Sequence, residues 1–97
     1  MAEYARVVTF EANDEALEAL LREIKSSDGP PEGVPAKRIT VLADRAAGKV
    51  VVAVRFGSED DLKKGHAAFE AMTPPTDGSL RRVSVDSYEV VLERETP

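Results

Sequence analysis

The chain has 97 residues and a mass of 10.5 kDa, which fits one compact domain spanning residues 1–97. Hydrophobic residues make up 42% of it and charged residues 32%, a composition typical of a folded globular protein and not of a disordered or fibrous one. A net charge of −5 argues against nucleic acid and anionic membranes as partners, and the absence of cysteine excludes disulfides, thiolate nucleophiles and cysteine-bound metals.

The N-terminal residues lack the basic and apolar regions of a signal peptide. The longest strongly apolar run, Val50–Val54, has five residues, where a membrane-spanning helix needs about twenty. We therefore expect a cytoplasmic protein that does not bind membranes.

The first third of the chain predicts a strand followed by a helix. Residues Tyr4–Phe10 are rich in β-branched and aromatic side chains, which favours a strand. Asn13 can cap a helix whose first turn is acidic. Four apolar residues then recur on one helix face: Leu17, Leu20, Leu21 and Ile24. The segment Gly29–Pro35 holds three prolines and predicts a loop.

The middle of the chain predicts a hairpin followed by a second helix. Arg38–Ala43 and Lys49–Phe56 are typical of strands, and the polar segment between them predicts the turn. Ser58 can cap the second helix, with Asp61 three residues later. One face of that helix should carry Leu62, Gly65, Phe69 and Met72.

The last segments predict a break in the helix and a long final strand. Thr73–Gly78 is rich in proline and should end the helix, and the strand should cover Arg82 to about Glu93. Its alternation changes phase, which we interpret as a β-bulge near Asp86 and Ser87; the alternative is that different neighbours bury both faces.

The predicted order is β-α-β-β-α-β, which is the ferredoxin-like α+β arrangement with a four-stranded antiparallel sheet. Right-handed crossovers place the first and third strands at the centre. Two helices can cover only one face of such a sheet, yet the third strand is apolar on both faces, with Val51 and Ala53 opposite its four other apolar residues. We therefore expect a homodimer in which the helix-free faces pack together.

Three features together carry a resemblance to a known family: the element order at this length, the second helix over residues 60–69, and the long final strand over 83–92. On these features the chain resembles the dimeric α/β-barrel superfamily, in particular the antibiotic biosynthesis monooxygenase-like domains. The resemblance implies two ferredoxin-like domains that pair sheet to sheet into an α/β barrel. Characterised members include cofactor-independent oxygenases of aromatic polyketides or quinols and haem-degrading enzymes.

Haem-degrading members combine a Trp, an Asn on the first strand and a His. This sequence has no Trp, and its first strand carries Arg6 and Thr9 but no Asn, so that only His66 matches. We therefore expect no haem and no other cofactor. We also expect no metal, because the acidic run Glu59–Asp61 is explained by its place at a helix N-terminus.

His66 is the single histidine and lies at the edge of the apolar stripe of the second helix. There it can act as a general base, or serve as a half-buried structural residue. Arg55, on the third strand, must find a carboxylate, a ligand or an interface. Tyr4, Tyr88 and Phe69 can line an aromatic ligand pocket or pack in the core and at the interface. The basic pairs Lys63-Lys64 and Arg81-Arg82 should be solvated.

Two functions remain open at this point. In the first, the protein is a small cofactor-independent monooxygenase-like enzyme for a flat apolar substrate, with His66 as base and Arg55 or Tyr88 near an oxyanion. In the second, it is a non-catalytic dimeric module that binds a small apolar or aromatic ligand or serves in assembly. A wide enclosed pocket that reaches His66 favours the first, and a filled core favours the second.

Overall fold

The computed structural model describes residues 2–26, 29, 33–71 and 80–96. Its elements follow the order expected from the sequence: β1 (Glu3–Ala12), α1 (Asp14–Lys25), β2 (Ala36–Asp44), β3 (Lys49–Phe56), α2 (Glu59–Ala71) and β4 (Leu80–Val90). The predicted ferredoxin-like α+β fold is therefore confirmed. Among the described residues, no helix has both the length and the apolar character needed to cross a membrane.

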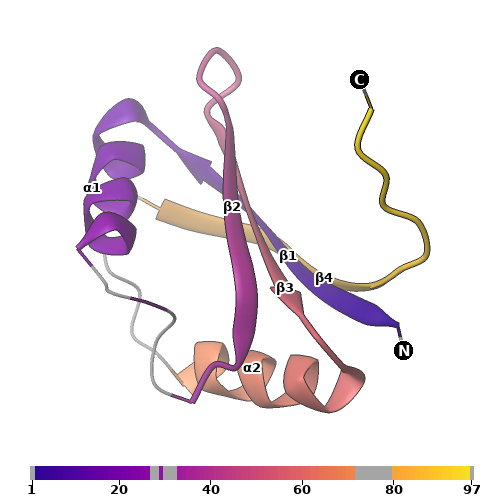
Figure 1. Cartoon of the computed structure of the whole chain (residues 1–97). Coiled ribbons are helices and arrows are strands. Elements are labelled where there is room, and N and C mark those ends of the chain that lie inside the picture. Colours follow the sequence, from indigo (N-terminus) through magenta and orange to yellow (C-terminus); the bar gives the residue numbers. More distant parts are fainter. Residues whose placement is uncertain (1, 27–28, 30–32, 72–79, 97) are drawn as a thin grey trace.

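The four strands form one antiparallel sheet in the order β2-β3-β1-β4. The first and third strands occupy its centre, as the crossover rule requires. Both helices lie on one side of the sheet (Figure 1). The sheet therefore has a helix-covered face and a helix-free face.

Both predicted helix caps are present. The Asn13 side chain accepts a hydrogen bond from the Ala16 backbone N–H at 2.8 Å. The Ser58 hydroxyl oxygen accepts one from the Asp61 backbone N–H at 3.1 Å. Each cap satisfies a backbone donor that the first helical turn leaves without an intrahelical partner, so it determines where the helix begins.

The core consists of two clusters under the two helices. Under α1 lie Leu17, Leu20, Val50 and Leu80. Under α2 lie Val34, Val54, Phe56 and Leu62. Phe56 is completely buried, and a Cβ on Gly65 would overlap its ring. Glycine at this position therefore allows α2 to lie close against β3.

The β-bulge of the last strand is not where the sequence predicted it. Asp86 and Ser87 pair in regular register with β1, and the register shift lies nearer the start of β4, where Val83 is the extra residue. The phase change near residue 86 reflects a different cause: Val85 faces the helices, whereas Tyr88 lies on the helix-free face and is 55% exposed. Of the earlier expectations, Met72, Thr73–Gly78 and part of the first loop lie outside the described residues.

Candidate functional site: a cleft between α2 and β4

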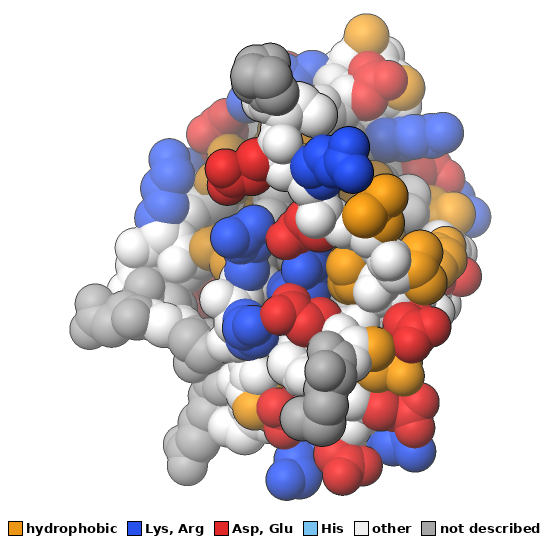
Figure 2. Space-filling model, turned by 45° about the vertical axis from the view of Figure 1, so that its right-hand side comes forward, with side chains coloured by type: hydrophobic (Ala, Val, Ile, Leu, Met, Phe, Trp, Pro, Cys, Tyr) orange, Lys and Arg blue, Asp and Glu red, His pale blue; other side chains and the backbone are white. Residues whose placement is uncertain are grey.

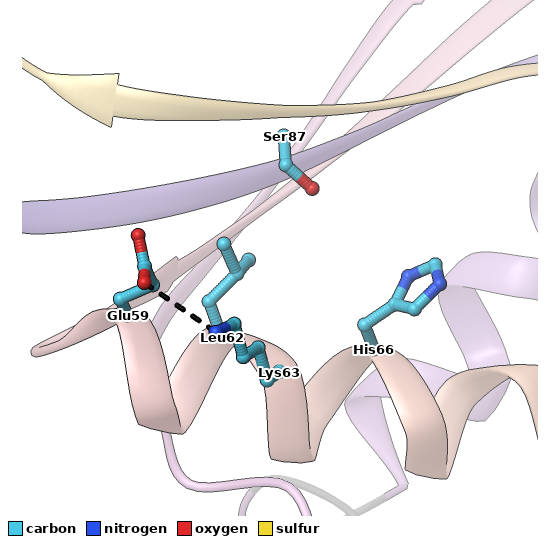
Figure 3. A pocket seen from close by; sticks show the side chains of 5 residues that line it. All are labelled: Glu59, Leu62, Lys63, His66 and Ser87. Carbon is cyan, nitrogen blue, oxygen red and sulfur yellow. Dashed lines mark ion pairs between the residues drawn. The ribbon is translucent and has the colours of Figure 1, made fainter.

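A cleft of about 540 Å³ opens between α2 and the edge strand β4. Its lining residues are Glu59, Leu62, Lys63, His66 and Ser87. Figure 3 shows Leu62 and His66 rising from α2 and Ser87 pointing down from β4 toward them. The cleft thus combines an apolar wall with an imidazole and a hydroxyl group, the mixture found in small-molecule sites.

His66 is held in place by an arginine of the central strand β1. Its Nδ1 accepts a hydrogen bond from the Nε–H of Arg6 at 3.2 Å. An imidazole that accepts at Nδ1 carries its proton on Nε2. In this arrangement the imidazole has no free lone pair, and its Nε2–H is its hydrogen-bond donor.

Arg6 is the one buried charged residue of the described chain, with 5% of its surface exposed. It points to the helix-covered face, where its guanidinium lies 4.9 Å from the centre of the Phe69 ring. Burial lowers the pKa of Arg6, and the carboxylate of Glu70 partly offsets this effect. Such a side chain needs good partners, because an unpaired buried charge is costly.

The charge partner of Arg6 is shared with a second arginine. Glu70 Oε1 accepts hydrogen bonds from Nη2 of Arg6 at 3.1 Å and from Nη1 of Arg82 at 2.7 Å. Arg82, together with Arg6, lowers the pKa of the Glu70 carboxyl. Arg82 was expected to be solvated; it is half-exposed, and it also joins β4 to α2 through this ion pair.

The other end of the cleft is formed by an ion pair on the first turns of α2. Lys63 Nζ lies 3.5 Å from Glu59 Oε1, drawn as a dashed line in Figure 3. Burial and the neighbouring Glu59 carboxylate raise the pKa of Tyr4, which packs against the core beneath α2. This end of the cleft therefore holds a carboxylate and an ammonium group that already form an ion pair with each other.

The structure brings together only part of the residues predicted from the sequence. His66 lines the cleft, and Phe69 packs behind it against Arg6. Arg55 and Tyr88 lie on the helix-free face of the sheet, and therefore belong to no common site with His66 within one chain. Arg55 forms ion pairs with Glu3, at 3.0 Å, and with Glu93, which raise its pKa. Arg55 lowers the pKa of the Glu93 carboxyl, and Lys37 together with Arg55 lowers that of Glu3.

Sequence reasoning missed three members of the polar cluster: Arg6, Glu70 and Arg82. One signal was available for Arg6, because it shares a strand face with Tyr4 and Val8, where an apolar residue is expected. No local pattern marks Glu70 or Arg82. No group of three or more potential metal ligands occurs among the described residues.

Comparison with known proteins supports the fold alone. No family model and no curated protein matches the chain. Among solved structures, the chain is similar to that of Rv0793 from Mycobacterium tuberculosis, with a TM-score of 0.53 and 15% sequence identity, over 98% of this chain and 99% of that one.

Proposed function

We propose that the protein is a small-molecule-binding domain of the monooxygenase-like kind, whose cleft between α2 and β4 holds a flat apolar ligand. The observation that carries the proposal is the position of His66, which lines the cleft and receives a hydrogen bond from the buried Arg6. A structural role alone does not require a cleft beside this residue.

The cleft suits a ligand that is mostly apolar and has a polar group at one end. Leu62 supplies apolar surface, while the imidazole of His66 and the Ser87 hydroxyl supply polar groups. A carbonyl or hydroxyl oxygen of the ligand would lie at this polar end of the cleft.

Binding is better supported than catalysis. Oxygenation without a cofactor requires a base that takes a proton from the substrate. His66 becomes such a base only when it releases Arg6, because that hydrogen bond uses its one lone pair. A monooxygenase acting on quinols is therefore the second candidate, and it needs this rearrangement in addition to binding.

Binding is tested by titration of flat aromatic compounds, including naphthols and quinols, into the wild type, His66→Asn and His66→Ala. Asparagine places an acceptor near the position of Nδ1 but lacks the Nε2–H donor. We expect both variants to lose about tenfold or more in affinity. Oxygen consumption measured in the same samples separates an enzyme from a binding module. If no compound binds the wild type, the proposal is wrong.

We also propose that the protein acts as a homodimer built through the helix-free face. In a single chain this face exposes large apolar side chains, among them Leu42 and Tyr88, which are 58% and 55% exposed. Figure 2 shows hydrophobic side chains grouped at the surface among charged ones. A second copy would cover such a patch, which is costly to leave in water.

Sedimentation at micromolar concentration tests the dimer, with an expected mass of twice 10.5 kDa. Leu42→Asp should give a folded monomer, because the residue is exposed in one chain and would be buried at the interface. Ile39→Asp is the matched control, since this residue lies on the other face of the same strand at 45% exposure. A wild-type mass of 10.5 kDa would contradict the proposal.

A further inference from the structure

We propose that the end of the cleft at His66 and Ser87 binds a carboxylate group of the ligand. Arg6 and Arg82 are the cationic partners in this site, and Glu70 is an internal occupant that the ligand displaces. The inference rests on the proposed function, because it assigns a charge class to the molecule that the cleft holds.

The polar cluster carries an excess of positive charge. Two guanidinium groups share a single oxygen of Glu70, while His66 is uncharged in the tautomer that accepts from Arg6. Among the described residues, Nη1 of Arg6 has no hydrogen-bond acceptor, although this side chain is only 6% exposed. A buried guanidinium with an unused donor and too little negative charge favours an added anion.

The cluster is next to the cleft. Arg6 and Ser87 are directly paired residues on the neighbouring strands β1 and β4, and Ser87 lines the cleft. His66 lines it as well and contacts Arg6. An anionic group that enters between His66 and Ser87 therefore lies beside the two residues that are next to Arg6.

The present occupant indicates which anion fits. A carboxylate already lies between the two arginines, and one of its oxygens accepts a hydrogen bond from each guanidinium group. Glu70 is 37% exposed, so its side chain can turn into water at little cost when another carboxylate takes its place. A second ion pair, between Glu11 and Arg81, lies on the helix-free face of the sheet. Its N–O distance is longer, at 3.8 Å.

The test compares two ligands of the same aromatic skeleton, naphthalene-2-carboxylate and 2-naphthalenemethanol, which differ in charge. Glu70→Gln removes the competing charge and keeps the shape of the side chain. We expect this variant to bind the carboxylate about tenfold more tightly, as a site does when its internal occupant is removed. Its affinity for the alcohol should stay within about twofold. Arg82→Gln should weaken carboxylate binding by about tenfold and leave the alcohol unaffected.

Glu11→Gln is the matched control, because it removes one carboxylate that pairs with a neighbouring arginine on the other face of the sheet. It changes the net charge by the same amount and should leave both affinities unchanged. The inference is overturned if Glu70→Gln fails to tighten carboxylate binding, or if Glu11→Gln has an equal effect. Binding of the alcohol with no charge dependence defeats this inference alone. Failure of both ligands to bind any variant defeats the proposed function.

Discussion

The two helices cover the same sheet face in different ways. Beneath α1 the described core cluster is apolar, and at the helix surface Arg45 pairs with Asp14 and Glu18 at 3.1 Å each. Beneath α2 the apolar cluster is joined by the buried Arg6, held by His66 and Glu70. The half of the domain under α1 is therefore stabilised by apolar packing, whereas the half under α2 also buries polar groups beside a cleft.

The same contrast appears in how closely the helices approach the sheet. The α1 helix packs through leucines, whereas α2 has Gly65 where it meets Phe56. The cleft lies along the same part of α2, between this helix and the edge strand β4. The predictions below test this division, from the largest expected effect to the smallest.

Removing apolar volume under α1 should have the largest effect on stability. Leu17 is 3% exposed, and Leu17→Ala should lower the free energy of unfolding by about 2–5 kcal/mol, through lost transfer energy and a cavity. Chemical denaturation measures this loss. The folded fraction of this variant should still bind ligand at the cleft. A loss of binding by the folded protein would contradict the view that the α1 half contributes to stability alone.

Adding one methyl group at the closest contact of α2 should have the next largest effect. Gly65→Ala places a Cβ against the ring of Phe56, which is fully buried and unable to move aside. We expect destabilisation by about 1–3 kcal/mol despite the higher helix propensity of alanine. Gly29→Ala is the control, since its Cβ would meet nothing within 4 Å. Equal melting temperatures for the two variants would show that the contact is unimportant.

Removing the acceptor of the buried arginine should cost a similar or smaller amount. His66→Ala leaves Nε of Arg6 without its partner and should destabilise the fold by about 1–3 kcal/mol. His66→Asn supplies an oxygen near the same position, and should recover most of this loss without recovering ligand affinity. Thermal unfolding and ligand titration of both variants separate the two roles. If His66→Asn is as unstable as His66→Ala, the hydrogen bond is not what stabilises this region.

Acidification should produce the smallest effect. Arg82 and Arg6 lower the pKa of Glu70 in the folded protein below its ordinary value of 4.5. The ion pairs therefore stabilise the protein fully above that value, and the contribution is lost as pH falls through the lower folded value. The difference in melting temperature between the wild type and Glu70→Gln should shrink on acidification from about pH 7 to about pH 3. A difference that grows on acidification would contradict this assignment.

The sequence by itself determined the features that depend on local order. The caps at Asn13 and Ser58, the apolar stripe of α1 and the bounds of β3 all follow from neighbours a few residues apart. The β-α-β-β-α-β order then left one arrangement of strands, because crossovers have a preferred hand.

The sequence singled out His66, but tertiary structure alone decided which residues contact it. Arg6 meets His66 across 60 residues of sequence and Glu70 across 64, so no local pattern could pair them. The same holds for Arg55 and Tyr88, whose placement on the helix-free face depends on strand register and on the bulge at Val83. Periodicity reports which side of an element a residue occupies, whereas the partners on that side are chosen only when the sheet and helices pack.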